Sequence, residues 1–210
     1  MRDFTCRAWY AVQHCSGCSE AVFLGNRTNL AGGRSDSDTK DFPRRARQFC
    51  ESWSRATLAR LGLALDFVQD NQSLSLATGT VRGLHYQAPP HAQDKLVRVG
   101  HGAILDVAVD VRTGSPDYGK WVGVELSAEN GRQLLIPKGF LHGFVTRAPD
   151  TLVLYKTTDV YAPDCDGTVH FADPDLAIDW GIAPDQAVLS DKDAKAPRLA
   201  DWTSPFTHES

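Results

Sequence analysis

The sequence predicts an all-β protein, built as an antiparallel sandwich or barrel with a few short helices. Between residues 66 and 171, short segments of alternating apolar and polar residues recur, separated by Gly, Pro, Asn or Asp. Val107, Val109 and Val111 show this alternation most clearly, as expected of a strand with one buried face. Many short strands with regular turn signals are typical of this architecture.

Composition indicates a globular protein with one ordinary domain. The 210 residues, 42% of them hydrophobic and 23% charged, are enough to bury a core. A net charge of −4 argues against broad binding to nucleic acids or anionic membranes. No apolar run approaches membrane-spanning length. The five cysteines have no framework spacing, so reduced thiols in the cytoplasm are the simplest interpretation.

The first 45 residues differ from the rest and are set apart as an atypical N-terminal segment, with the main domain expected over 46–205. Residues 26–40 are rich in Gly, Ser, Asn and Asp, and they are interpreted as loop or disorder. One C-x-x-C pattern is too little for a zinc module, and chance is the simpler explanation. That weak metal pattern consists of His14, Cys15 and Cys18.

Order is expected from about Phe49 onwards. Ser54 is a plausible N-cap for a helix over 55–61. The strand that follows, 67–73, carries a polar face that is either solvated or a hydrogen-bonding wall for a polar ligand. Three residues form this face: Gln69, Asn71 and Ser73.

Residues 79–100 combine two strands with groups suited to proton transfer. The first strand carries Arg82 and His85, and side chains of such a strand alternate between its faces. Two prolines then force a loop, and Lys95 opens the second strand. A base and a permanent cation around a rigid loop suit chemistry next to a carbonyl group. An ordinary hairpin with surface charges is the plainer alternative.

Further strands are predicted through the C-terminal half of the chain, and the tail from about residue 185 is expected to pack as irregular chain. The predicted strands cover residues 106–111, 121–126, 133–136, 140–146, 152–157 and 169–171, with a loop over 163–167.

A series of short motifs runs through most of the chain, from about Phe49 to Asp201. They include FVQDN at 67–71, VRGLHYQ at 81–87, KLVR at 95–98, IPKGFLHGF at 136–144, YKTT at 155–158 and LSDKD at 189–193. Together these motifs resemble the dTDP-4-dehydrorhamnose 3,5-epimerase family in order and spacing. The resemblance implies a cupin-type double-stranded β-helix (jelly roll), a homodimer, a nucleotide-sugar substrate, and no metal or cofactor.

The resemblance also implies a reaction. The expected substrate is dTDP-4-dehydro-6-deoxy-D-glucose, which would be epimerised at carbons 3 and 5 to give dTDP-4-dehydro-L-rhamnose. A proton next to the 4-keto group would be abstracted and then replaced on the opposite face. Two alternatives stay open: epimerisation at carbon 3 alone, in a deoxysugar antibiotic pathway, and a non-catalytic jelly roll that binds a nucleotide sugar.

Four catalytic residues follow from the resemblance. His85 corresponds to the base and Asp193 to its paired carboxylate; an imidazole titrates near neutral pH and a carboxylate orients it. Lys95 corresponds to the cation near the carbonyl oxygen, where negative charge develops in the enolate. Tyr155 corresponds to the acid on the opposite face. Taken singly, a core tyrosine and a turn-capping aspartate are the plainer interpretations, and the joint spacing favours the catalytic ones.

Eight substrate-binding residues also follow from the resemblance. Arg82 corresponds to a diphosphate ligand, which its bidentate guanidinium suits, and Tyr161 corresponds to an aromatic residue that stacks on thymine. Ala46 stands where the family's phosphate-binding arginine is expected, and Arg45 and Arg47 are the candidates to replace it. The full set is Glu51, Gln69, Asn71, Arg82, His142, Tyr161, Asp166 and Lys192.

A metal site is a weaker alternative. Metal-binding jelly rolls gather histidines from their strands, and His85, His91 and His142 are the candidates. Such sites typically carry an H-x-H pair, whereas Tyr86 and Gln87 follow His85. No nucleophile elbow, Walker loop or dinucleotide glycine fingerprint occurs in a fitting context. A metal-free site without cofactor is therefore expected.

Overall fold

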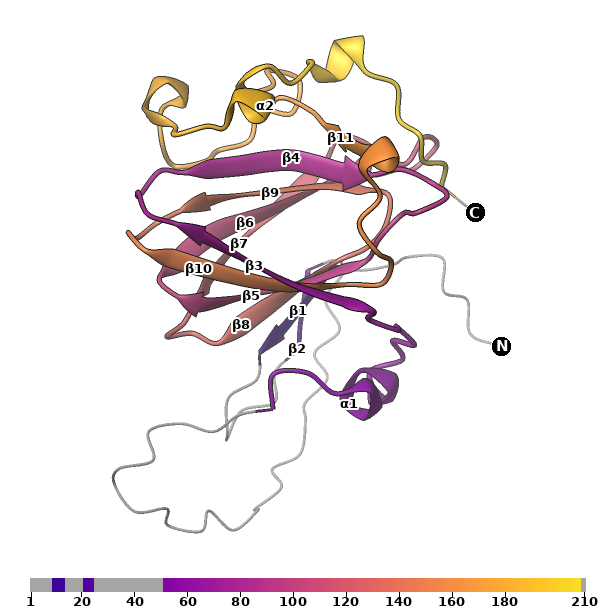
Figure 1. Ribbon diagram of the computed structural model, residues 1–210. Coiled ribbons are helices and arrows are strands. Elements are labelled where there is room, and N and C mark those ends of the chain that lie inside the picture. Colours follow the sequence, from indigo (N-terminus) through magenta and orange to yellow (C-terminus); the bar gives the residue numbers. More distant parts are fainter. Residues whose placement is uncertain (1–8, 14–20, 25–50, 209–210) are drawn as a thin grey trace.

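The computed structural model describes residues 9–13, 21–24 and 51–208. Two antiparallel sheets lie face to face as a sandwich (Figure 1). In spatial order the six-stranded sheet contains β2 (Ala21–Leu24), β1 (Trp9–Gln13), β8 (Arg132–Ile136), β5 (Lys95–His101), β10 (Thr151–Thr157) and β3 (Gln69–Ser75). The five-stranded sheet contains β11 (Asp166–Thr168), β4 (Val81–Gln87), β9 (Phe140–Thr146), β6 (Ala103–Asp110) and β7 (Trp121–Ser127).

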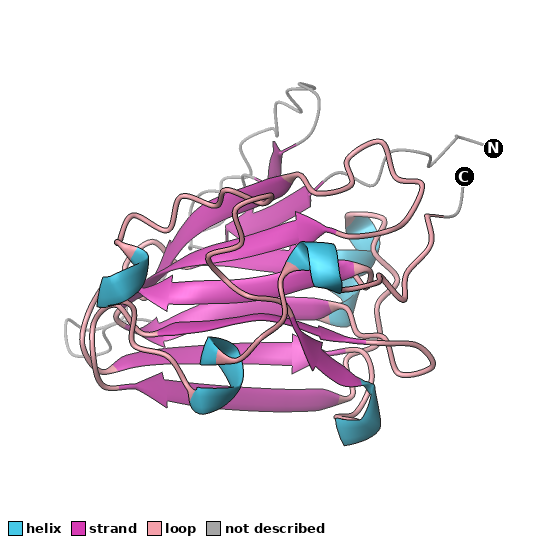
Figure 2. Ribbon diagram, turned by 90° about the horizontal axis from the view of Figure 1, so that it is seen from above, coloured by secondary structure: helices cyan, strands magenta, loops and turns pink. Residues whose placement is uncertain are grey.

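Short helices complete the described part of the chain, and Figure 2 shows several of them along the loops over the sandwich. They are α1 (Arg55–Arg60), η1 (Pro163–Cys165), η2 (Pro184–Gln186), α2 (Asp191–Ala194) and η3 (Leu199–Asp201).

Apolar residues form two cores, one on each face of the five-stranded sheet. The inner core lies between the sheets and joins Ile104 and Phe144 to Val97 and Val153. The outer core lies on the other face of the five-stranded sheet, beneath the chain that follows β11 (Figure 1). Because β9 contributes alternate side chains to the two cores, every residue of this strand is buried. Its sequence, FLHGFVT, therefore lacks the alternation of apolar and polar residues that a strand with one buried face shows.

A bulge in β4 sets the direction of two side chains that the sequence singles out. Arg82 pairs with Phe144 and His85 pairs with His142, so three residue steps on β4 match two on β9. In an unbroken strand, residues three positions apart lie on opposite faces. The extra residue therefore puts Arg82 and His85 on one face, towards the six-stranded sheet. The outer core receives the other face of β4, including Val81 and Leu84.

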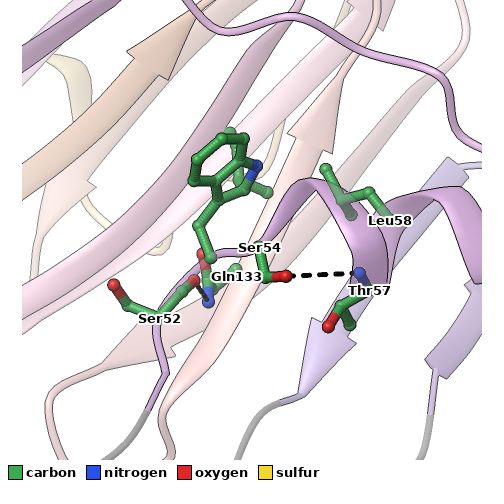
Figure 3. Close-up of a pocket in the computed structure, with 7 residues that line it drawn as sticks. Ser52, Ser54, Thr57, Leu58 and Gln133 are labelled. Atoms are coloured by element: carbon green, nitrogen blue, oxygen red, sulfur yellow. Dashed lines mark hydrogen bonds between the residues drawn. The ribbon is translucent and has the colours of Figure 1, made fainter.

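The helix near residue 55 forms as predicted. Ser54 caps α1 by accepting a hydrogen bond from the Thr57 backbone N–H at 3.4 Å (Figure 3). Leu58 is the buried residue of this helix. The helix packs beside Leu96 and Gln133, which belong to the outer face of the six-stranded sheet and line a small pocket there with residues 52–54, 57 and 58. This pocket is separate from the space between the sheets.

The short strand after residue 163 is shifted relative to the prediction. The sequence predicts a strand over 169–171 and a loop over 163–167, whereas the structure has β11 over Asp166–Thr168. Asp166 pairs with Gln87 and Thr168 with His85, so polar residues form the strand. Val169 and Phe171 are apolar because they enter the outer core, rather than because they belong to a sheet.

The N-terminal segment contains two strands that the sequence analysis did not predict. β1 pairs with β2 and also with β8, which extends the six-stranded sheet. The predicted loop over 26–40 lies outside the described residues, as do the weak metal pattern at 14–18 and the arginines at 45 and 47.

Gly83→Ala is expected to destabilise the protein at the bulge. A Cβ atom at residue 83 would lie 2.6 Å from the carbonyl oxygen of His142, and the φ of +119° adds strain of about 1–3 kcal/mol. Gly114→Ala is the matched control, because Gly114 also has a positive φ, of +84°, but a Cβ there meets nothing within 4 Å. Urea denaturation should show the larger loss of unfolding free energy for Gly83→Ala. Equal losses would contradict a close backbone approach at this bulge.

Candidate functional site

Polar side chains gather between the sheets at the end where β4 and β10 finish. Lys95 shares a strand face with Val97, and Tyr155 shares one with Val153; both valines belong to the inner core. His142 lies on the inner face of β9 by the same alternation, and its partner His85 lies beside it on β4. The five-stranded sheet therefore supplies the histidines, and the six-stranded sheet supplies Lys95 and Tyr155.

His85 and Asp193 form a close pair. His85 Nε2 lies 2.6 Å from Asp193 Oδ1, and the carboxylate side chain is 3% exposed whereas the imidazole is 32% exposed. Because a carboxylate accepts, Nε2 carries the proton and Nδ1 keeps a lone pair for use as a base. The buried carboxylate thus fixes the tautomer of a histidine that solvent and ligand can reach.

The Asp193 carboxylate stays ionised despite its burial. Burial raises its pKa, but hydrogen bonds from His85, from the Ser190 hydroxyl and from the backbone of Gly83 outweigh this effect. The net result is a pKa below the ordinary value for aspartate. Ser190 is also the N-cap of α2, and the chain before it follows β4 through the bridge between Thr80 and Val188. The segment that runs along the edge of β4 therefore positions the Asp193 carboxylate next to His85.

The pKa of the Lys95 ammonium is lower than that of an ordinary lysine. Burial lowers the pKa of its ammonium to about 8, against the attraction of Asp166 and Asp106. Lys192 lowers this pKa further. Lys95 is therefore cationic at neutral pH but poorly solvated. A cation in such a place stabilises a developing oxyanion more strongly than a hydrated one would.

Tyr155 keeps its proton at neutral pH. Burial raises the pKa of its phenol, the positive charge of Arg82 lowers it, and Asp166 raises it; the net direction is upward. A half-buried tyrosine with a raised pKa is protonated at neutral pH and can act as a proton donor. Tyr155 pairs with Asn71 on one side and with Val97 on the other, so its place in the sheet is fixed on both sides.

A second histidine–aspartate pair lies beside the first. His142 Nε2 is 2.7 Å from Asp106 Oδ1, and Asp106 is fully buried. Burial lowers the pKa of His142, Asp106 opposes this, and the nearby Lys95 and His85 lower it again. His142 is therefore neutral, with its proton on Nε2. Within the described part of the chain, the other oxygen of Asp106, Oδ2, has no hydrogen-bond partner.

Asp106 and Ser190 are site residues that the sequence analysis missed. In the sequence Asp106 alternates with the apolar Val107, as in a strand with one solvated face, whereas β6 is buried on both faces over its last five residues. An aspartate between apolar residues in a strand buried on both faces is a signal for a buried ion pair, but only the two-core packing shows that the strand is of this kind.

Arg82 lies at the border between the two sheets. Its Nε donates to Ser75 Oγ at 3.2 Å and a terminal nitrogen donates to the Leu74 carbonyl at 3.3 Å. Both acceptors are at the end of β3, in the other sheet. The side chain is exposed and makes no ion pair within the described residues, so its charge is available to an anionic ligand.

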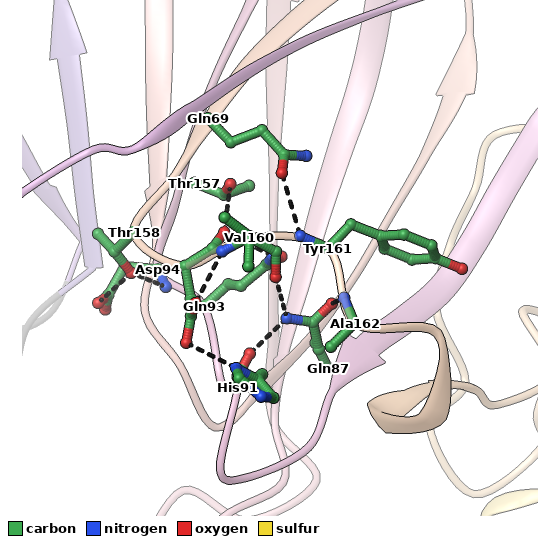
Figure 4. Close-up of polar contacts among 11 residues, drawn as sticks. Gln69, Gln87, His91, Gln93, Asp94, Thr157, Thr158, Val160, Tyr161 and Ala162 are labelled. Atoms are coloured by element: carbon green, nitrogen blue, oxygen red, sulfur yellow. Dashed lines mark hydrogen bonds and ion pairs between the residues drawn. The ribbon is translucent and has the colours of Figure 1, made fainter.

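Tyr161, Asp166 and Lys192 form a connected group near the same end. The Tyr161 hydroxyl lies 3.4 Å from Asp166 Oδ2, and Lys192 pairs with the same oxygen. Tyr161 is 57% exposed, so its ring is open to a ligand. Gln69 accepts a hydrogen bond from the backbone N–H of Tyr161 through Oε1 (Figure 4). Its Nε2 donates to Asn71 Oδ1. The polar face of β3 thus points inward, which favours the second of the two alternatives that the sequence left open, a hydrogen-bonding wall over a solvated face.

Glu51 is the predicted site residue that this chain does not bring to the cluster. Its carboxylate accepts a hydrogen bond from the Thr57 hydroxyl at 3.1 Å, on α1 and outside the six-stranded sheet. The other eleven predicted residues lie around the space between the sheets or along its rim.

The three histidines of the metal alternative do not converge. His91 pairs with Asp159 at 3.3 Å, whereas His85 and His142 bind separate aspartates. Among residues 9–13, 21–24 and 51–208, no group of three or more His, Cys, Asp or Glu residues could hold a metal ion. In the same part of the chain, no helix is long and apolar enough to cross a membrane.

The geometry suits proton transfer on two sides of one carbon atom. His85 approaches from the five-stranded sheet with a free Nδ1, and Tyr155 approaches from the six-stranded sheet with a firmly held proton. Lys95, on the same sheet as Tyr155, supplies positive charge to the same space, where a carbonyl oxygen would become an enolate.

Comparisons with known proteins point to one family. The family model described as dTDP-4-dehydrorhamnose 3,5-epimerase matches residues 39–201. A relative from Sinorhizobium fredii, itself named dTDP-4-dehydrorhamnose 3,5-epimerase, is 50% identical over 160 residues, which are 76% of this chain and 80% of the relative.

Two solved structures extend the comparison. A dTDP-6-deoxy-D-glucose-3,5-epimerase from Legionella pneumophila, in complex with dTDP-4-keto-L-rhamnose, is 46% identical with a TM-score of 0.72, over 77% of this chain and 86% of that one. A 3'-monoepimerase from Streptomyces bikiniensis, in complex with dTDP-quinovose, is 35% identical with a TM-score of 0.66, over 72% and 76%. These likenesses confirm the predicted cupin-type jelly roll. The protein belongs to the dTDP-4-dehydrorhamnose 3,5-epimerase family.

Proposed function

We propose that this protein epimerises dTDP-4-dehydro-6-deoxy-D-glucose at carbons 3 and 5, giving dTDP-4-dehydro-L-rhamnose. The observation that carries the proposal is the placement of His85 and Tyr155 on opposite sheets, facing one space that also holds Lys95. Inversion of a carbon needs a base on one face and a proton donor on the other. The names and ligands of the relatives supply the substrate class.

Each inversion proceeds by one proton exchange. Nδ1 of His85 takes the proton from the carbon beside the 4-keto group. The C–H electron pair then forms a double bond to carbon 4, and the π pair of the carbonyl moves onto the keto oxygen. Asp193 stabilises the imidazolium that results, and Lys95 stabilises the enolate. Tyr155 then gives its proton to the opposite face of the same carbon, and the carbonyl is restored. Solvent reprotonates Tyr155 and deprotonates His85 before the next cycle.

The nucleotide is assigned to the rim of the site. We propose that the exposed charge of Arg82 binds the diphosphate and that the open ring of Tyr161 stacks on thymine. Gln69, Asn71, His142, Asp166 and Lys192 would complete the binding set. Asp106 would act through His142, whose Nδ1 it leaves free to accept a hydrogen bond from a sugar hydroxyl.

We also propose that the protein acts as a homodimer in the cytoplasm. Among the described strands, β3 is an edge of its sheet, and Leu74 and Leu76 beside this edge are 54% and 69% exposed. A second copy of the chain that covers this edge would bury both leucines. Glu51 lies outside the site of its own chain, so in a dimer it would contribute to the site of the partner. Cys165 is a free thiol, as expected in the cytoplasm. Sedimentation as a monomer at micromolar concentration would refute the dimer.

A second candidate, epimerisation at carbon 3 alone, is supported by the likeness to the Streptomyces bikiniensis monoepimerase. Both activities use the same base and cation, so the two differ only in which carbons exchange. Incubation with substrate in heavy water, followed by mass spectrometry, separates them. We expect deuterium at both carbons. Deuterium at carbon 3 alone would select the second candidate. Binding of dTDP without any exchange would leave a non-catalytic nucleotide-sugar-binding protein.

Substitution of His85 and Tyr155 should separate exchange from inversion. His85→Ala is expected to abolish both, because a general base contributes about two to four orders of magnitude. Tyr155→Phe keeps the ring and its packing but removes the donor, so deuterium exchange should survive better than net inversion. Both rates are measured on one sample. Equal losses of exchange and inversion in Tyr155→Phe would remove Tyr155 from the mechanism and leave it as a core tyrosine.

The rate should fall on the alkaline side as Lys95 loses its proton. With the pKa of Lys95 lowered to about 8, kcat/KM is expected to decrease above pH 8, far below the range in which Tyr155 ionises. Lys95→Arg keeps the positive charge, and an arginine does not deprotonate in this range. The variant should therefore lose the decrease near pH 8, even if its rate is lower throughout. A decrease that persists unchanged in Lys95→Arg would assign it to another group.

A further inference from the structure

The loop that carries Tyr161 is held in place mainly by side-chain amides rather than by a sheet. This loop, residues 158–162, joins β10 in one sheet to η1 beside the other. Its backbone N–H at residue 161 binds Gln69, and its carbonyl at residue 159 accepts from Gln93 at 2.9 Å and from the Thr157 hydroxyl. Figure 4 shows the amides of Gln69, Gln87 and Gln93 converging on the loop from three separate segments.

Gln87 makes the most extensive of these contacts. Its Oε1 accepts from the backbone N–H of Ala162 at 3.0 Å, and its Nε2 donates to the carbonyl of Val160 at 3.0 Å. The same Nε2 donates to the carbonyl of His91 in the loop after β4. The side chain is 6% exposed, so these bonds form largely without competition from water. One amide therefore holds the residues on both sides of Tyr161.

The position of Gln87 connects two parts of the site. It is the last residue of β4 and shares the inner face of that strand with His85, two positions earlier. In the other direction it pairs with Asp166 on β11, whose carboxylate meets the Tyr161 hydroxyl. The loop with the exposed aromatic ring is thus fixed to the strand that carries the base.

We propose that Gln87 is the positioning residue for nucleotide binding: its amide holds Tyr161 in the place where the ring can stack on the nucleotide. This inference rests on the proposed function, because it takes Tyr161 to be the contact for thymine. The chemistry singles out an amide at this position. The loop offers a carbonyl on one side of Tyr161 and an N–H on the other, and only a group with both a donor and an acceptor satisfies the pair.

A double-mutant cycle tests the inference, with dTDP as the probe and calorimetry as the readout. Gln87→Met keeps the volume and removes the hydrogen bonds, and its Kd for dTDP should rise about tenfold, the effect of losing one or two net bonds. Tyr161→Ala should weaken binding by a similar or larger factor. If Gln87 acts through Tyr161, the double variant binds dTDP no more weakly than Tyr161→Ala alone.

Turnover provides a second readout that a purely structural role would not produce. Because the thymine contact is remote from carbons 3 and 5, Gln87→Met should raise KM while kcat stays within about threefold. Gln93→Met is the matched control: it removes a neighbouring amide that binds Asp159 and Val160 but not Ala162, and its effect on the Kd should be small. If Gln87→Met does not fold, Gln87→Glu takes its place, since it keeps the acceptor for Ala162 and loses both donated bonds.

Three results would overturn the inference. An unchanged Kd in a folded Gln87 variant would remove Gln87 from nucleotide binding. Fully additive losses in the double variant would show that Gln87 acts independently of Tyr161, and failure of both Gln87 variants to fold would make it a residue of the fold alone. Failure of the proposed function looks different: the unmodified protein would then not bind dTDP, or Tyr161→Ala would bind it as well as the unmodified protein does.

Discussion

The site depends on one constraint, the pairing of β4 with β9 across the bulge at Gly83. The extra residue on β4 brings Arg82 and His85 onto the same face, and close backbone contact with His142 leaves no room for a Cβ atom. The backbone of Gly83 also hydrogen-bonds the Asp193 carboxylate and helps keep it ionised. The local backbone geometry at Gly83 therefore determines the direction in which His85 points. It also helps to determine the position and the charge of the Asp193 carboxylate.

Several titratable side chains near β4 are buried, and most of them are hydrogen-bonded in histidine–aspartate pairs. His85 with Asp193 and His142 with Asp106 are two such pairs, and their histidines lie on adjacent strands of one sheet. Burial lowers the pKa of Lys95, and the attraction of Asp166 and Asp106 offsets this effect only in part. Such an arrangement costs stability, because each buried charge loses hydration. The same loss of hydration makes these groups effective partners for a charge that develops during proton transfer.

The two sheets are joined at the rim by side chains as well as by the chain itself. Arg82 reaches the end of β3, and Gln87 holds the loop that leaves β10. Both residues lie on β4 and both contact the opposite sheet or its connections. A single strand therefore coordinates the base, the anion-binding arginine and the nucleotide loop. These contacts explain how site residues on the two sheets can stay at a constant distance from one another, although the sheets are not joined by strand pairing in the part of the chain that the structure describes.

The sequence by itself determined the fold class, the Ser54 cap, the alternation of β3 and the order of the site motifs, because strand alternation and capping depend on residues close together in the chain. It placed a strand at 169–171 wrongly, since apolar residues in a core outside the sheet follow the same pattern as a strand. Asp106 and Gln87 became visible only in three dimensions. Their partners lie 36 and 75 residues away, and no local pattern specifies contacts over such distances. The tertiary structure alone decided which polar residues face one another, because that depends on how two sheets pack and where one strand bulges.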